Sequence, residues 1–152
     1  MLKISKADYD LIRWEAAGSY PNEGCGIILG NMVEGCRMVD MLYTCNNART
    51  DSAANSYTIT SKQVFSATKL ARTRAATIIG FYHSHPDHSP FYSPTDLAEA
   101  HWFDCSYVIT SVEKGHVRAT NSYVLVGGED NKRFLPEEIE IMAYEQPLRI
   151  AL

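Results

Sequence analysis

The stretch Gly80-Phe81-Tyr82-His83-Ser84-His85-Pro86 carries the strongest local signals in the chain. A β-branched, apolar run at 76–79 precedes it and predicts a buried strand. Side chains two residues apart on a strand share a face, so His83 and His85 should project together from its end. An H-x-H pair alone is weak support for a metal site, but a third ligand within reach would complete one.

A carboxylate follows in Ser93-Pro94-Thr95-Asp96, a segment that predicts the start of a helix continuing to about residue 103. Ser93 suits the N-cap and Pro94 the first helical position, while Asp96 in the first turn favours the helix dipole. This cap accounts for the three residues without any metal. The two interpretations are compatible, because a first-turn position would also aim the Asp96 carboxylate back at the strand end.

Composition narrows the class of protein. The 152 residues, 45% hydrophobic and 21% charged, predict one globular domain. A net charge of −4 without a basic cluster argues against a nucleic-acid partner. Residues 1–10 carry no signal-peptide pattern and no apolar run reaches the length of a membrane span, so we expect a cytoplasmic protein without membrane contact. The cysteines lack C-x-x-C spacing and should be free buried thiols: Cys25, Cys36, Cys45 and Cys105.

Short apolar, alternating or β-branched runs predict a sheet. These runs lie at 25–30, 36–44, 76–86, 106–110 and 117–126. Hairpin signals outnumber β-α-β signals, so we expect a mixed, α+β-like α/β fold rather than a purely parallel sheet. The chain should form a single domain over 1–152, with its core at about 3–126 and a tail strand or loosely docked tail in 127–152.

Two further helices should flank the sheet. The first should begin after Ser5 as its N-cap, with Leu11 and Trp14 recurring at helical spacing on one apolar face. The second should begin at Ser61 and turn Phe65 inward. Together with the helix after Ser93, they give the sheet the cover that a buried strand requires.

Glu23 stands directly before the apolar strand at 25–30. Position alone favours a solvated loop carboxylate. A zinc-activated water that attacks a carbonyl, however, also needs a base and later an acid, and glutamate is a common choice for both. The polar loop at 46–55 could lie over such a site.

In order and spacing, Glu23, His83-Ser84-His85-Pro86 and the Ser93…Asp96 pair resemble the JAMM motif, also called MPN+. That motif consists of a glutamate, then H-S/T-H-P, then S-x-x-D, with seven residues between the second histidine and the serine. This chain has seven, at 86–92, and departs from the motif at no element. The resemblance covers about 3–126 and points to a compact prokaryotic-type member of the JAMM/MPN+ (Mov34/PAD-1) zinc metallopeptidase family.

The resemblance implies a helix-flanked sheet similar to the cytidine-deaminase fold. It also implies one Zn²⁺ per chain, held by His83, His85 and Asp96 with a water as fourth ligand. Glu23 would accept a proton from that water and pass it to the leaving amine. Ser93 would donate a hydrogen bond to the oxyanion, beside its equally plausible role as a helix cap.

The same resemblance implies hydrolysis of an amide or isopeptide bond at the C-terminal Gly-Gly tail of a ubiquitin-like or sulfur-carrier protein. The loops at 46–55 and 113–121 are short, which favours a small prokaryotic-type enzyme over a deubiquitinase with large insertions. Whether the chain forms a homodimer stays open.

Three alternatives remain beside this interpretation. A non-catalytic scaffold of the same fold would typically lack the metal ligands, and this chain retains them. A zinc nucleoside deaminase would need H-x-E and P-C-x-x-C, and neither occurs. A peptidoglycan- or phage-associated zinc peptidase would use the same chemistry, so only substrate assays separate it from the favoured function.

Overall fold

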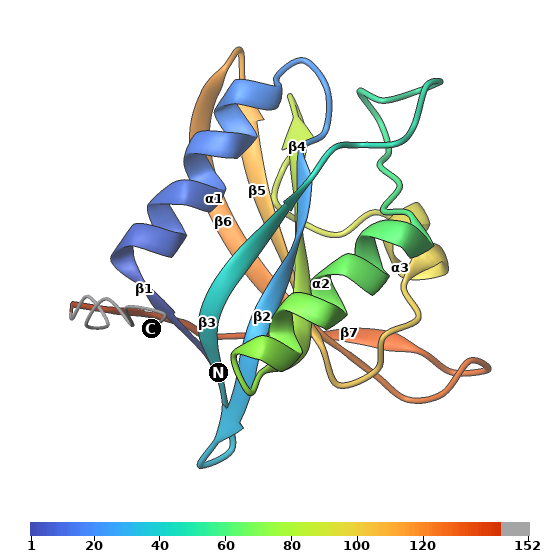
Figure 1. Cartoon of the computed structure of the whole chain (residues 1–152). Coiled ribbons are helices and arrows are strands. Elements are labelled where there is room, and N and C mark those ends of the chain that lie inside the picture. The colour runs from blue at the N-terminus through green and yellow to red at the C-terminus, as the bar shows by residue number, and fades with distance from the viewer. Residues whose placement is uncertain (144–152) are drawn as a thin grey trace.

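The computed structural model describes residues 1–143, which fold into one eight-stranded mixed sheet with helices packed on it (Figure 1). The mixed α/β fold predicted from the sequence is confirmed. No helix among these residues combines the length and apolarity that a membrane crossing requires. In chain order the elements are β1 (Leu2–Ser5), α1 (Lys6–Ser19), β2 (Cys25–Val33), β3 (Cys36–Cys45), α2 (Ser61–Thr73), β4 (Thr77–Pro86), α3 (Pro94–Glu99), β5 (Ser106–Glu113), β6 (His116–Val126), β7 (Arg133–Glu137) and β8 (Ile139–Met142).

Strand β4, which carries both histidines, lies in the middle of the sheet. The strand order is β7-β6-β5-β4-β2-β3-β1-β8, so β4 pairs antiparallel with β2 and parallel with β5. His83 lies opposite Cys25 of β2 on one side and Ile109 of β5 on the other. Neighbours on both sides fix the β4 backbone, so the histidines project from a rigid support.

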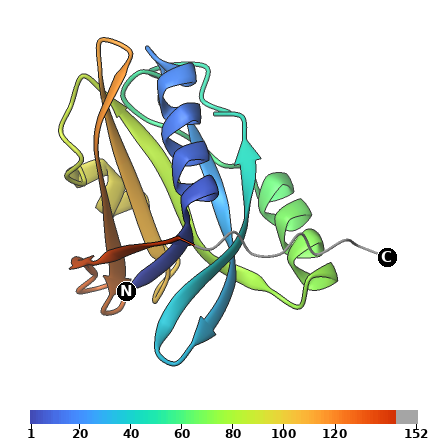
Figure 2. The same ribbon diagram turned by 90° about the vertical axis from the view of Figure 1, so that its left-hand side faces the viewer.

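The two edge strands are consecutive in the chain. β7 pairs with β6, β8 pairs with β1, and only Glu138 separates them. The stretch 133–142 therefore links both ends of the curled sheet, and in Figure 2 it runs crosswise to the long strands. At the crossing point the buried Glu137 carboxylate accepts hydrogen bonds from Ser122 Oγ at 2.6 Å and Arg37 Nη1 at 3.2 Å.

Of the two forms expected for the segment after residue 126, a tail strand or a loosely docked tail, the structure shows strands, because β7 and β8 pair at the two edges of the sheet. Phe134 of β7 is only 5% exposed and packs among the rings of Tyr92, Tyr107 and Tyr123. Part of the 127–152 segment, from residue 144 on, lies outside the described residues. Within the described part, β7 belongs to the core.

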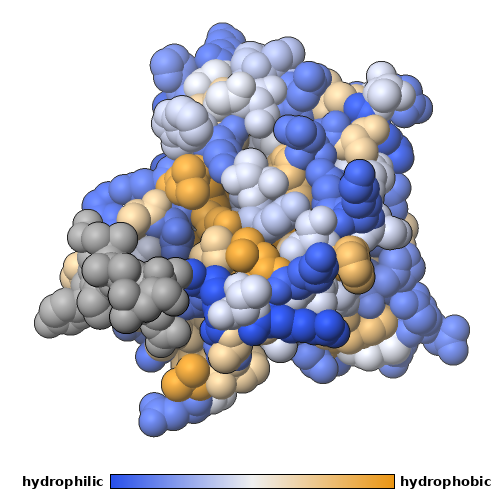
Figure 3. Space-filling view, viewed as in Figure 1, coloured by the Kyte–Doolittle hydropathy of each residue, from blue (hydrophilic) through white to orange (hydrophobic). Residues whose placement is uncertain are grey.

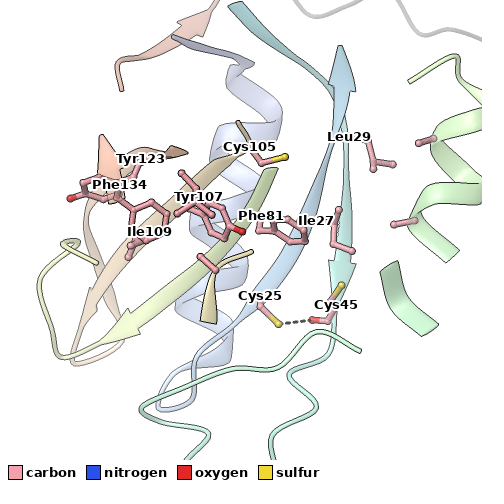
Figure 4. Packing of buried hydrophobic residues seen from close by; sticks show 14 of the residues in the cluster. Cys25, Ile27, Leu29, Cys45, Phe81, Cys105, Tyr107, Ile109, Tyr123 and Phe134 are labelled. Carbon is pink, nitrogen blue, oxygen red and sulfur yellow. Dashed lines mark hydrogen bonds between the residues drawn. The ribbon is translucent and has the colours of Figure 1, made fainter. Parts of the chain in front are cut away.

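Apolar side chains gather in two clusters, one on each face of the sheet. The cluster beneath α1 includes Ile12 and Val108, while that beneath α2 and α3 includes Phe81 and Ile109 (Figure 4). On the outer face seen in Figure 3, hydrophobic residues form small separate patches among hydrophilic ones. The core thus lies on both sides of the β4 strand and supports it from above and below.

The four cysteines are free thiols, as the sequence predicted. Three of them are buried, and Cys36 at the start of β3 is half-buried instead. Burial raises the pKa of Cys25 to about 12 and that of Cys45 to about 11. These thiols are therefore core residues rather than nucleophiles.

Helix α1 begins where the sequence predicts, because Ser5 Oγ accepts a hydrogen bond from the Asp8 N–H at 3.1 Å. The residues that recur at helical spacing, Leu11 and Trp14, do not form its buried face. Trp14 is 73% exposed, and the residues that face the sheet are Ile12 and Ala16. At about 100° per residue, the Leu11–Trp14 face lies roughly 150° around the helix axis from the Ile12–Ala16 face, and spacing alone could not identify the buried side in so weakly patterned a segment.

Helix α2 begins at Ser61 as predicted, with Thr60 forming a capping box with Gln63. Phe65, expected to face inward, is 65% exposed. The buried residues are Ala67 and Ala71, whose small side chains let the helix lie close to the sheet.

Helix α3 ends at Glu99, earlier than the predicted end near residue 103. After it, the Trp102 N–H donates to Tyr107 Oη at 3.1 Å, and Lys132 Nζ donates to the carbonyls of Ala98 and Ala100. These tertiary partners satisfy backbone groups that a longer helix would have satisfied internally. The helix can therefore end at Glu99 without leaving these groups without hydrogen bonds.

Candidate metal centre

His83 and His85 lie at the end of β4 with their side chains on the same face, as the pleat of a strand requires. Both are buried, and their Nε2 atoms are 3.1 Å apart. Ser84, on the opposite face, accepts a hydrogen bond from the Gly24 N–H at 2.8 Å. Ser84 thus has a structural role, because it joins the segment that carries Glu23 to the histidine strand.

Asp96 reaches both histidines from the first turn of α3. Its Oδ2 lies 3.0 Å from His85 Nε2 and its Oδ1 3.3 Å from His83 Nε2. Ser93 is the N-cap: its Oγ accepts from the Asp96 N–H at 3.0 Å, and its own N–H donates to Asp96 Oδ2 at 2.8 Å. The capping box therefore fixes the direction of the carboxylate, and the two interpretations of Asp96 hold together.

The charge states of these groups follow from burial and from one another. Burial lowers the pKa of His83, which favours the neutral imidazole that ligates metals. Burial would also lower the pKa of His85, but its hydrogen bonds to Asp96 and to the Ser89 carbonyl outweigh that effect and raise it. Burial would raise the pKa of Asp96, yet the hydrogen bonds from His83 and His85 hold it well below its usual range. Asp96 is therefore a carboxylate.

Glu23 is buried, only 4% exposed, rather than a solvated loop residue. Its N–H donates to the Ala53 carbonyl at 2.8 Å, and its carbonyl accepts from Asn47 Nδ2 at 3.1 Å. Its Oε1 lies 4.0 Å from His85 Nε2, while its buried Oε2 has no hydrogen-bond partner among the described residues. Burial raises the pKa of Glu23 to about 8; the charge of His85 opposes the shift and that of Asp96 adds to it.

The donor set suits a zinc ion. Donor atoms of Glu23, His83 and His85 lie within 4.8 Å of one another, and Asp96 approaches the two histidines more closely still. Imidazole nitrogens and carboxylate oxygens are ordinary zinc ligands. The 2.8 Å contact from His85 Nδ1 to the Ser89 carbonyl orients the ring, as outer partners of metal-bound histidines do. An unpartnered buried oxygen on Glu23 also favours a cation or a bound polar molecule beside it.

The shorter contacts distinguish the two acidic residues. Asp96 lies within 3.0–3.3 Å of both imidazoles, whereas Glu23 stands 4.0 Å from His85. Asp96 is accordingly the better candidate for the third ligand, and Glu23 is set back far enough to act on a molecule between them.

A cavity of about 380 Å³ opens beside these residues. It contains both groups for which the sequence suggested a catalytic role, Glu23 and Ser93. His88, which also lines the cavity, is exposed. The lining residues are Glu23, Asn55, His85, His88, Ser89, Phe91, Tyr92, Ser93 and Thr95.

Two residues at the site, Tyr57 and Asn47, were not predicted from the sequence. Tyr57 stacks on His83, with ring centroids 4.4 Å apart and planes inclined by 24°. Asn47 uses its whole side chain: Nδ2 donates to the carbonyls of Glu23 and Ser56, and Oδ1 accepts from the N–H groups of Arg49 and Thr58. These contacts, the Ala53 carbonyl that accepts from the Glu23 N–H and the place of Asn55 in the cavity lining put loop 46–55 beside the site. An asparagine in a polar loop gave no signal that could single it out.

Asn47→Ala should destabilise the protein by about 2 kcal/mol, because four hydrogen bonds are lost and buried carbonyls are left without a donor. Chemical denaturation measures this difference. Asn46→Ala, in the exposed preceding residue, is the matched control and should change stability by less than about 0.5 kcal/mol. Equal stabilities of the two variants would show that Asn47 does not hold the loop.

Comparison with known proteins agrees with this geometry. A family model described as prokaryotic homologs of the JAB domain matches residues 5–139. The chain is 30% identical over 96 residues to a desampylase from Haloferax volcanii. The aligned residues cover 63% of this chain and 67% of that protein.

Solved structures share the fold over nearly the whole chain. A solution structure from Desulfitobacterium hafniense has a TM-score of 0.78 at 25% identity and covers 95% of this chain and 94% of that one. A solution structure from Salinibacter ruber has a TM-score of 0.72 at 34% identity and covers 97% of this chain and 95% of that one. The crystal structure of a JAB1/MPN domain protein from Archaeoglobus fulgidus matches in fold, with a TM-score of 0.56 at 18% identity. The match covers 93% of this chain and 97% of that one. With the family model spanning most of its length, the chain belongs to the prokaryotic homologs of the JAB domain, the JAMM/MPN family that its motif resembles.

Proposed function

We propose that this protein is a zinc-dependent metallopeptidase. Its substrate would be an amide or isopeptide bond at the C-terminal Gly-Gly tail of a ubiquitin-like or sulfur-carrier protein. The observation that carries the proposal is the buried Glu23 carboxylate, set 4.0 Å from His85 at the edge of a cluster of two histidines and an aspartate. The similarity to a desampylase supports a substrate of the ubiquitin-like class.

His83, His85 and Asp96 would hold the zinc ion. Zinc bound there would supply a Lewis acid and lower the pKa of a water to about 7. The other parts of the reaction belong to the chain itself. The rigid β4 strand and the α3 capping box keep the three side chains converged, so no rearrangement is needed before substrate arrives.

Glu23 would move the proton. A group that accepts a proton and later donates it works best when its pKa lies near the working pH, and burial raises the pKa of Glu23 to about 8. Its carboxylate would take the proton from the attacking water as the C–O bond forms. It would then give this proton to the nitrogen of the leaving amine, so that the amide C–N bond breaks as the tetrahedral intermediate collapses. The backbone contacts to Ala53 and Asn47 hold Glu23 in place for both transfers.

Ser93 would orient the substrate. It lines the same cavity as Glu23, and its Oγ accepts the Asp96 N–H, so the hydroxyl proton is left to donate. A hydrogen bond from this proton to the oxygen of the scissile carbonyl would stabilise the charge that develops there.

A direct test uses a small β-grasp carrier protein extended by a few residues beyond its Gly-Gly end. The zinc-loaded enzyme should remove the extension, a metal chelator should stop the reaction, and added zinc should restore it. Mass spectrometry of the carrier identifies the cleaved bond. Stoichiometric zinc without cleavage of either peptide- or isopeptide-linked carriers would favour a scaffold role, and cleavage of peptidoglycan fragments instead would favour the cell-wall alternative.

A further inference from the structure

A second cavity, of about 280 Å³, adjoins the metal centre on the face covered by α2 and α3. Tyr57 connects the two sites, because its ring both stacks on His83 and lines this cavity. The pocket therefore begins one aromatic ring away from a candidate metal ligand. Its lining residues are Tyr57, Thr58, Ile59, Val64, Phe81, Glu99, Trp102 and Tyr107.

Aromatic residues make up half of the lining of this pocket, which we call the aromatic pocket, and they are fixed in place. Phe81 and Tyr107 are buried, with ring centroids 5.5 Å apart. The Trp102 ring packs edge-on against Phe81 with centroids 5.4 Å apart, and the Trp102 backbone N–H donates to Tyr107 Oη. Lys132 Nζ donates to the carbonyl oxygens of Ala98 and Ala100, just before Trp102, at 2.8 Å each. Trp102 is still 41% exposed, so a ring surface remains open to a ligand.

Glu99 is the one charged residue among the eight that line the aromatic pocket. It lies on α3 one helical turn after Asp96, and it is exposed. A purely apolar ligand would contact the aromatic walls and make no interaction with the exposed Glu99 carboxylate. A ligand with an apolar stem and a cationic head would satisfy both parts.

We propose that the aromatic pocket binds an arginine or lysine side chain of the substrate tail, at the position just before the two glycines. The stem would lie against Trp102 and Phe81, and the cationic head would pair with Glu99. An extended chain rises about 3.3 Å per residue, so two glycines span roughly 7 Å, enough to reach from the scissile bond past Tyr57. This inference rests on the proposed function for the identity of the ligand, and it adds a specificity residue, Glu99, to it.

Binding can be measured without catalysis. The chain has two tryptophans, and Trp14 is exposed on α1, so Trp14→Phe leaves Trp102 as the sole tryptophan reporter. The zinc-loaded Trp14→Phe protein would be titrated with short peptides ending in Arg-Gly-Gly, Leu-Gly-Gly or Glu-Gly-Gly while Trp102 fluorescence is followed. The arginine peptide should bind about tenfold more tightly than the leucine peptide, and the glutamate peptide should bind weakest.

Charge reversal tests Glu99 itself. Glu99→Lys should abolish the preference for arginine and improve binding of the glutamate peptide, with a change of about tenfold or more in the ratio of the two. The matched control is Glu34→Lys in the exposed β2–β3 turn, which should leave the ratio unchanged. Equal binding of the arginine and leucine peptides, or an unchanged ratio in Glu99→Lys, would overturn the proposal.

The kinetics of carrier proteins with the same three tails separate this inference from the function on which it rests. Cleavage of all three with equal kcat/KM would overturn the aromatic pocket as a specificity site and leave the peptidase intact. If the protein bound the arginine peptide preferentially but cleaved no carrier, the aromatic pocket would stand as a binding site and the proposed peptidase activity would be refuted.

Discussion

Glu23→Gln should retain stoichiometric zinc and lose activity by about a thousandfold or more. Glutamine preserves the size and the backbone contacts of Glu23, so the segment joined to Asn47 and Ala53 should stay in place. It cannot accept the proton of the attacking water or return it to the leaving amine. General acid–base groups typically contribute 10²–10⁴-fold, and Glu23 would serve in both directions.

The measurement pairs zinc content with kcat on the extended carrier protein. Glu34→Gln, in the exposed β2–β3 turn, controls for the loss of one carboxylate and should behave as the parent. If Glu23→Gln remained active, Glu23 would not be the base. If it lost zinc, Glu23 would be a ligand, a role that its donor atom within 4.8 Å of the histidines would permit.

His85→Ala should lose bound zinc after dialysis. The change removes the nitrogen that lies 3.1 Å from His83 Nε2 and 3.0 Å from Asp96 Oδ2, at the centre of the cluster. Loss of an outer partner of a metal ligand already costs about 10–100-fold in affinity, so loss of a ligand should cost more. Activity should fall with the zinc content.

Elemental analysis of the dialysed protein checks this result. His116→Ala, on the exposed start of β6, controls for the loss of one imidazole and should keep its zinc. Circular dichroism should show that both variants are folded. Zinc unchanged in His85→Ala would refute the ligand assignment.

The parts of the site that the sequence predicted depend on local rules. His83 and His85 share a face because strands are pleated, and Asp96 points at them because Ser93 caps α3. Both follow from residues close together in the chain, whatever the rest of the fold does.

The parts that the sequence did not predict depend on contacts between distant segments. Trp14 is exposed because the sheet selects Ile12 and Ala16 of α1, and that choice needs the position of the helix over the sheet. Tyr57 stacks on His83 only once the segment after loop 46–55 lies against β4. The sequence of β7 has no clear strand pattern. Its place in the sheet is fixed by pairing with β6 and by the Arg37–Glu137 ion pair.

The stretch 133–142, which joins the two ends of the sheet, also governs the order in which the fold can be completed. β1 is synthesised long before its partner β8, whereas β7 follows β6 after a short connection. Until those residues emerge, a growing chain exposes two unpaired strand edges, the kind of surface that invites aggregation. The β1–β8 pairing joins segments far apart in sequence, and such pairings close slowly. The final closure of the sheet is thus a late folding event, and the β4 platform for the metal can form before it.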